Sequence, residues 1–440
     1  MERFAIKDLI AWKNSPFRKP LLLKGVRQVG KTWLLKEFGR CYYQNIAYFN
    51  FDESPEYKGY FTVTKNVKRI IPILAMAGGQ EILPEKTLVI FDEIQECPEA
   101  LNALKYFCEN AHEYHIIGAG SLLGIALSKP YSFPVGKVDF LMLYPMNFQE
   151  FLLAMGNKNF VDYLNQIDKI EPIPEMFFNP LSEKLKMYFI TGGMPEVIDN
   201  WFKTQSVDMI QSTLQNIINS YESDFTKHIE NKEYPKITRI WHSLSSQLAR
   251  ENKKFLYNAV KEGARAREYE DALEWLLNAA VVCKISRITS PKLPLSAYED
   301  LSAFKIYLSD VGILRRLSKL APSAFREENR LFTEFKGALT ENFILQSIIP
   351  QIDSLPYYWS QINPSYEVDF VVQYENDIIP IEVKADTNIK SRSLKKYTEL
   401  FKSQTKLRVR FSMNNLKLDD DVLNIPLFMA DQLVKLVNLC

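Results

Sequence analysis

The sequence contains no pair of cysteines with Cys-x-x-Cys spacing. Its five cysteines, an odd number, are scattered along 440 residues: Cys41, Cys97, Cys108, Cys283 and Cys440. This usage indicates neither a disulfide framework nor a zinc site, and it fits a reducing compartment. With 47% hydrophobic and 24% charged residues, the chain has the composition of an ordinary globular protein.

An excess of charge of one sign and long apolar runs are also missing. The formal net charge is +1, so no global electrostatic attraction to nucleic acid or to an anionic membrane is expected. No run of about 18 uncharged apolar residues occurs, and the first residues contain no apolar signal core. We therefore expect a cytoplasmic protein without a membrane span.

Several domains are expected, because 440 residues exceed the roughly 250–300 residues at which a single hydrophobic core stops growing. From residue 20 to 143, short apolar runs alternate with amphipathic segments, which is typical of a parallel sheet with helices on both faces. We predict an α/β protein in four parts: an α/β core (1–143), a helical lid (144–230), a winged-helix-like domain (231–325) and a second α/β domain (326–440).

A phosphate-binding motif, Gly-x-x-x-x-Gly-Lys-Thr, follows the first apolar run. In such a loop, backbone N–H groups cradle phosphate oxygens, and the next helix directs its positive end at the same anion. The lysine is expected to hold the β- and γ-phosphates and the threonine to bind Mg²⁺. The motif predicts that ATP and Mg²⁺ bind at Gly25, Val26, Arg27, Gln28, Val29, Gly30, Lys31 and Thr32.

Two acids end a later apolar run. Residues 88–91 are followed by Asp92 and Glu93. Asp92 is predicted to complete the Mg²⁺ shell, and Glu93 to be the base that orients the attacking water. Paired acids suit hydrolysis better than phosphoryl transfer to a small acceptor. The alternative is a degenerate site that binds ATP without turnover.

Weaker candidates follow the next apolar run. Ser121 comes directly after a glycine-rich turn and is predicted to lie near the γ-phosphate, although a helix-capping serine is an equal interpretation. Lys129 and Lys137 are the nearest candidates for a cationic finger, but solvated surface lysines are commoner. No arginine finger is identified.

A second candidate site lies near the C-terminus. Asp369 lies on one expected strand, and Glu382 and Lys384 are at the end of the next. Restriction-type nucleases have this Asp…Glu-x-Lys arrangement, in which two carboxylates bind Mg²⁺ and the lysine activates water. Glu341, on the preceding helix, is predicted to complete the metal shell. The alternative is an ordinary ion pair between strand ends, and a nuclease-like fold does not imply cleavage.

A weak signal for DNA binding lies in the middle of the chain. Helical segments followed by two short strands suggest a winged helix, and Arg265 and Arg267 precede a helix as phosphate contacts would. An interaction or spacer role is an equal alternative, because acids on that helix would repel the DNA backbone. These acids are Glu268, Glu270, Asp271 and Glu274.

Motifs along nearly the whole chain resemble the AAA-type ATPases of bacteria and archaea that carry a C-terminal domain of unknown function. The resemblance implies an AAA module of the ASCE class of P-loop NTPases, a winged-helix-like middle and a C-terminal domain similar to PD-(D/E)xK nucleases. The motifs are residues 19–32, 91–95, 118–121, 134–138, 148–152 and 192–196, and the set Glu341, Asp369, Glu382 and Lys384.

The resemblance also implies a role for the loop at residues 193–195. In related signal-transducing ATPases a Gly-x-Pro element of the lid contacts adenine, so Pro195 is expected to do so here. Lys137 stands where many relatives carry arginine, which weakens its assignment as a finger. We expect an ATP-driven switch acting on nucleic acid or another macromolecular partner. The alternatives are a regulatory module that holds ATP without turnover and a metal-dependent DNA nuclease.

Overall fold

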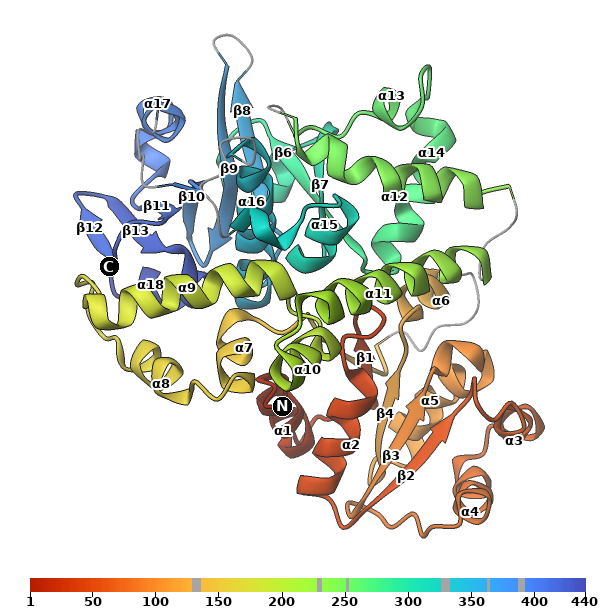
Figure 1. The fold of residues 1–440 in the computed structure, drawn as a ribbon. Helices are drawn as coiled ribbons and strands as arrows, with labels where there is room; N and C mark the ends of the chain where they lie inside the picture. The colour runs from red at the N-terminus through yellow and green to blue at the C-terminus, as the bar shows by residue number, and fades with distance from the viewer. Residues whose placement is uncertain (129–135, 228–231, 251–252, 326–332, 362–364, 387–391) are drawn as a thin grey trace. The chain divides into compact units, whose positions relative to one another are not determined.

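The computed structural model divides the chain into two units. One comprises Glu2–Tyr144 and Glu274–Val281, and the other comprises Met1, Pro145–Leu273 and Val282–Cys440. Each unit is described by itself. The residues that the structure describes are 1–128, 136–227, 232–250, 253–325, 333–361, 365–386 and 392–440 (Figure 1).

A five-stranded parallel sheet forms the centre of the first unit, in the order β2-β3-β4-β1-β5 (Figure 1). One strand, β4, lies between β1, which precedes the glycine-rich motif, and β3, which ends in the paired acids. This order confirms the predicted ASCE-type P-loop NTPase fold. The strands are Leu21–Lys24 (β1), Asn45–Asn50 (β2), Thr87–Asp92 (β3), His115–Ala119 (β4) and Asp139–Met142 (β5).

Helices cover both faces of this sheet. On one face, Gly39 of α2 lies directly against Ile46 and Leu88. On the other, Phe49 and Phe91 join an apolar cluster with residues of three helices, α3, α4 and α5. Burial on both faces explains the uninterrupted apolar runs of the strands. The helices are α1 (Ala5–Asn14), α2 (Lys31–Tyr42), α3 (Tyr57–Val63), α4 (Val67–Gly78), η1 (Ile94–Glu96), α5 (Pro98–Asn110) and α6 (Leu123–Ser128).

An eight-stranded mixed sheet forms the centre of the second unit, in the order β12-β13-β11-β10-β9-β8-β6-β7. β10 with β11, β11 with β13, and β6 with β8 are parallel pairs, and the other neighbours are antiparallel. The strands are Val282–Ile288 (β6), Glu299–Leu308 (β7), Tyr357–Gln361 (β8), Tyr366–Tyr374 (β9), Asp377–Val383 (β10), Arg408–Ser412 (β11), Lys417–Asp419 (β12) and Val422–Pro426 (β13).

This sheet crosses the boundary predicted at residues 325 and 326. β6 comes from the predicted winged-helix-like part and β8 from the predicted C-terminal part, yet Arg287 pairs with Tyr358 and Ile288 with Trp359. Ile288 and Trp359 also belong to one apolar cluster. The two predicted parts therefore share one sheet, and the division between them stays a prediction.

The remaining elements of the second unit are helical. Residues 145–227 contain helices α7 to α11, and α12, α13 and α14 precede the β6–β7 hairpin. No helix in the described ranges combines the length and apolar character needed to cross a bilayer. The α-helices are α7 (Phe148–Ala154), α8 (Lys158–Gln166), α9 (Glu175–Thr191), α10 (Pro195–Thr204), α11 (Val207–Lys227), α12 (Tyr234–Leu248), α13 (Tyr257–Val260), α14 (Ala266–Asn278, divided between the units), α15 (Val311–Leu317), α16 (Thr333–Ile348), α17 (Arg392–Leu400) and α18 (Leu433–Val437).

Candidate functional site

The glycine-rich motif forms a tight loop between β1 and α2. Its backbone has positive φ angles at Gly25 (154°), Gln28 (64°) and Gly30 (93°). A Cβ at Gly25 would lie 2.4 Å from the carbonyl oxygen of Leu143, so only glycine fits there. α2 begins at Lys31 and carries no acid in its first turn. Its N-terminal N–H groups and positive dipole end are therefore suited to an anion.

The loop has a buried side and an exposed side. Val26 and Val29 are buried in the core of the unit, whereas Arg27 and Gln28 are exposed. The apolar anchors fix the loop against the sheet. Of the four residues between the two glycines, the two valines thus support the loop, and the arginine and the glutamine face solvent.

Arg3 is a further contact of the loop that sequence analysis missed. Its buried guanidinium donates hydrogen bonds to the carbonyl oxygens of Val29, at 2.9 Å, and Tyr144, at 2.6 Å. These bonds connect the loop to the residue that follows β5 by two positions. No sequence signal marks Arg3, because its role depends on tertiary contacts with two carbonyl groups.

Lys31 lies over the loop that precedes it. Its Nζ donates hydrogen bonds to the carbonyl oxygens of Gly25, at 2.9 Å, and Val26, at 3.0 Å. Only 7% of its surface is exposed. The ammonium is therefore held at the loop, where the motif predicts phosphate.

Thr32 and Asp92, the two predicted Mg²⁺ ligands, are in direct contact. The Thr32 hydroxyl donates to Oδ2 of Asp92 at 2.7 Å. Tyr48 of β2 donates to the same oxygen at 2.8 Å, and burial and the adjacent Asp92 raise the pKa of Tyr48, so the phenol stays protonated. Hydroxyl and carboxylate oxygens are ligands that Mg²⁺ prefers, so this pair fits the metal. Tyr48 was not predicted.

Glu93 lies beside Gln95 and Ser121. Its backbone has a φ of 49°, a left-handed conformation that is uncommon for a residue with a side chain. Gln95 Nε2 donates to Oε2 of Glu93 at 2.6 Å, and the Ser121 hydroxyl lies 3.5 Å from the same oxygen. A Cβ at Gly120 would lie 1.9 Å from Oε1 of Gln95. Ser121 is therefore brought to the predicted base, and Gln95 is a partner that sequence analysis missed.

The structure provides no contact that supports Lys129 or Lys137 as a cationic finger. Lys137 forms an ion pair with Glu109 at 3.0 Å, which accounts for its charge locally. Lys129 lies outside the described residues. No lysine finger is therefore assigned.

Pro195 belongs to the second unit and is the first residue of α10. The loop before it is fixed by the fully buried Asp310, whose Oδ2 accepts a hydrogen bond from the Gly193 N–H at 2.6 Å. Gly192 has a φ of 69°, and a Cβ there would lie 2.2 Å from Oδ1 of Asp310. The loop is thus rigidly supported. The contact of Pro195 with adenine stays a prediction.

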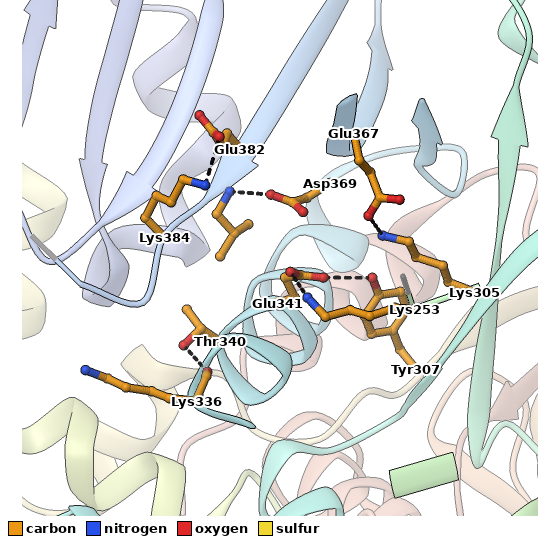
Figure 2. A network of polar contacts seen from close by, with 11 residues as sticks. Lys253, Lys305, Tyr307, Lys336, Thr340, Glu341, Glu367, Asp369, Glu382 and Lys384 are labelled. Atoms are coloured by element: carbon orange, nitrogen blue, oxygen red, sulfur yellow. Dashed lines mark hydrogen bonds and ion pairs between the residues drawn. The ribbon is translucent and has the colours of Figure 1, made fainter. Parts of the chain in front are cut away.

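Glu341, from the second candidate site, has a partner on each carboxylate oxygen (Figure 2). Lys253, from the segment between α12 and α13, pairs with Oε1, and Tyr307 of β7 donates to Oε2 at 3.2 Å. Burial disfavours ionisation of Glu341, but the lysine charges outweigh it, and the pKa of Glu341 is lowered. Glu341 is therefore held as a carboxylate by protein groups.

Asp369 and Glu382 also have protein partners. Asp369 Oδ2 accepts a hydrogen bond from the Val383 N–H at 2.8 Å, and Glu382 Oε1 pairs with Lys384 at 3.0 Å (Figure 2). Burial, and next the nearby charge of Glu341, raise the pKa of Asp369 to about 8.

The three predicted metal ligands of this site are not assembled as such. Within the described ranges, no three carboxylate, imidazole or thiolate groups are placed to hold one metal ion. Glu341, Asp369 and Glu382 instead contact lysines, a tyrosine and a backbone amide. Oε2 of Glu382 is buried without a hydrogen-bond donor, and the metal role of Glu341, Asp369 and Glu382 stays a prediction.

The residues considered for DNA binding lie on exposed surface. Arg265 and Arg267 are exposed at the start of α14. The four acids of the helix, Glu268, Glu270, Asp271 and Glu274, are exposed as well. The mixed charge leaves the two interpretations of this helix open.

Three protein-family models match parts of the chain. Residues 17–152 match the model of a family described as an AAA domain. This match covers most of the first unit and the first residues of the second. Residues 182–324 and 336–428 match two families described as domains of unknown function, DUF8612 and DUF4143. No curated protein matches the chain.

Several solved structures are similar in part to the chain. A Walker-type ATPase of Pyrococcus abyssi is 14% identical, with a TM-score of 0.45 over 72% of this chain and 95% of that chain. The RuvB Holliday junction branch migration motor of Thermotoga maritima is 13% identical, with a TM-score of 0.31 over 64% and 89%. The Aeropyrum pernix ORC1 protein in complex with DNA is 11% identical, with a TM-score of 0.28 over 73% and 92%.

Proposed function

We propose that the protein is an ATPase that binds ATP with Mg²⁺ in the AAA domain and hydrolyses it to drive a switch acting on nucleic acid or another macromolecular partner. The observation that carries this proposal is the convergence of four side chains. Lys31 and Thr32 at the start of α2 lie at the same edge of the sheet as Asp92 and Glu93 at the end of β3.

Each residue of this set has a part that its contacts support. The loop N–H groups and Lys31 bind the phosphates. Thr32 and Asp92 hold Mg²⁺, which supplies charge neutralisation at the phosphates when bound. Glu93, kept beside Ser121 by Gln95, accepts the proton of the attacking water.

The test is Mg²⁺-dependent ATP hydrolysis by the full chain, with and without DNA. Lys31→Ala should remove ATP binding and turnover together. Glu93→Gln should retain ATP binding and lose turnover by about a hundredfold or more, because it keeps the shape of the side chain and removes the base. Turnover that survives in Glu93→Gln would contradict the role of Glu93. An increase with DNA would identify the class of partner.

A second candidate function is a regulatory module that holds ATP without turnover. One observation favours it: the carboxylate of Glu93 is already hydrogen-bonded to Gln95 at 2.6 Å. Tight binding of ATP by the wild type without release of phosphate, under any condition of DNA or salt, would favour this module over the ATPase. The third function suggested by the sequence, metal-dependent DNA cleavage, requires three metal ligands placed together, and no such group is found among the residues that the structure describes.

A further inference from the structure

Three carboxylates and two ammonium groups meet in the second unit (Figure 2). Glu341 comes from α16, and Glu367 and Asp369 come from β9. Lys305 comes from β7, and Lys253 from the segment between α12 and α13. We call these five residues the lysine–carboxylate cluster. It brings together segments that are far apart in the sequence.

Lys305 is buried within this cluster, and Lys253 is partly buried. Lys305 has no exposed surface and pairs with Glu367, and its charge also acts on Glu341 and Asp369. Lys253 is 15% exposed and pairs with Glu341. Long, flexible lysine side chains are almost never buried unless they are paired, so both ammonium groups are committed to these carboxylates.

Grouped carboxylates that are wholly or partly buried need positive charge, because removing an ion from water is costly unless it is compensated. A divalent metal or protein ammonium groups can supply that charge. Here both oxygens of Glu341 are engaged, one by Lys253 and one by the Tyr307 hydroxyl. The donors that surround Glu341 therefore belong to the chain itself.

We infer that lysine ammonium groups take the place of a divalent metal in the lysine–carboxylate cluster. Lys253 is then a tethered cation, that is, a positive charge covalently attached to the chain, and it fastens the segment between α12 and α13 to α16. The cluster is then a clamp within the second unit, in which each lysine is paired with a carboxylate. It needs no metal. The inference is independent of the proposed ATPase function.

The direct test is the binding of Mn²⁺ to the full chain without nucleotide, measured by calorimetry or by paramagnetic resonance. Wild type and Glu341→Gln should give the same binding isotherm, because no metal contacts Glu341. A site of the wild type that disappears in Glu341→Gln would overturn the inference. This comparison uses no lysine variant, so it does not depend on whether such a variant folds.

A second test removes the tethered cation. Lys253→Met keeps most of the side-chain volume but leaves Glu341 without its ammonium partner, and the melting temperature should fall by about 5 °C or more. Lys261→Met, which removes the same charge from an exposed position nearby, should change it by about 1 °C at most. The double variant Lys253→Met/Glu341→Gln should melt higher than Lys253→Met, because the uncompensated carboxylate is gone.

Melting temperatures measured in millimolar Mn²⁺ test whether Lys253 stands in the place of a metal. If Lys253 supplies the charge that a metal would otherwise supply, Mn²⁺ should raise the melting temperature of Lys253→Met and leave that of the wild type unchanged. Equal melting temperatures of Lys253→Met and Lys261→Met would overturn the clamp. A rise in the wild type that is lost in Glu341→Gln would show a metal site in its place.

Discussion

The side-chain amide of Gln95 donates a hydrogen bond of 2.6 Å to Oε2 of Glu93. This bond engages one of the two carboxylate oxygens of the proposed base, and its donor lies three residues beyond the strand-ending Asp92. Because a base must be oriented toward its water to accept a proton efficiently, Gln95 is a positioning residue in the proposed reaction.

Gln95→Met should therefore slow hydrolysis. Methionine retains the length of the side chain but cannot donate, and a hydrogen bond to a charged group contributes roughly 1.5–3 kcal/mol. We expect kcat to fall by about tenfold or more, with ATP affinity changed by less than about threefold. Steady-state turnover and equilibrium nucleotide binding measure the two effects. An unchanged kcat would show that Gln95 does not orient the base.

Gly120→Ala should act through Gln95. Its Cβ would lie 1.9 Å from Oε1 of Gln95, so the glutamine must move and its bond to Glu93 is disturbed. We expect a loss of kcat similar to that of Gln95→Met. In a Gln95→Ala background, which removes the clash, the same substitution should have little further effect, because residues in contact are not additive. Additive losses would argue that Gly120 matters for another reason.

Arg3→Met should weaken ATP binding although Arg3 is remote from the motif in the sequence. The substitution leaves the carbonyl oxygen of Val29 without the guanidinium that donates to it at 2.9 Å. A buried acceptor that loses its donor costs about 1–3 kcal/mol, and part of that cost falls on the ordered loop. We expect the Kd for ATP to rise by about tenfold, measured by titration with a fluorescent analogue. Arg3→Lys should recover part of the loss.

His115 should make the first unit less stable at acidic pH. Burial first, and then the charges of Arg18 and Lys13, lower the pKa of His115 from 6.5 to about 4, and its Nδ1 lies 2.7 Å from the Tyr43 hydroxyl. The folded state favours the neutral ring, so its contribution is complete above pH 6.5. It is lost as the pH falls toward 4, by about 3 kcal/mol in total.

His115→Gln isolates this effect. Glutamine can still accept a hydrogen bond from Tyr43 but does not titrate in this range. The free energy of unfolding, measured with denaturant from pH 7.5 to 4, should fall less steeply for the variant than for the wild type. Other carboxylates titrate in both proteins, so the difference between the two curves is the relevant quantity. Parallel curves would show that His115 ionises equally in both states.

The sheet of the first unit was predictable because parallel strands buried on both faces leave uninterrupted apolar runs. Residues 88–91 mark β3, and its end fixes the positions of Asp92 and Glu93. The contact of Tyr48 with Asp92 was not predictable. It depends on the register in which Tyr48 of β2 lies opposite Ile90 of β3, and the apolar pattern of either strand alone does not specify that register.

The second unit was less predictable, because its organisation rests on contacts between distant segments. Lys253 and Glu341 are 88 residues apart in the chain, and no local pattern joins them. The pairing of β6 with β8 likewise depends on contacts between residues far apart in the sequence. The predicted boundary therefore separates strands that share one sheet.

Asp310 offers a test of the predicted adenine contact of Pro195. Its two oxygens accept hydrogen bonds from the N–H groups of Gly193, at 2.6 Å, and Ile313, at 3.0 Å. Asp310→Asn replaces one acceptor with a donor, so at least one of these bonds is broken and the support of the loop before Pro195 is weakened.

If Pro195 contacts adenine, weakening the support of this loop should reduce binding of the base and leave binding of the phosphates intact. Asp310→Asn and Pro195→Gly should then reduce the preference for ATP over GTP by about tenfold, with the affinity for inorganic triphosphate unchanged. Asp208→Asn, at an exposed position on α11, is the matched control and should behave as the wild type. If both variants keep the wild-type preference for ATP, the adenine is recognised elsewhere, and the loop that Asp310 fixes serves the stability of the second unit alone.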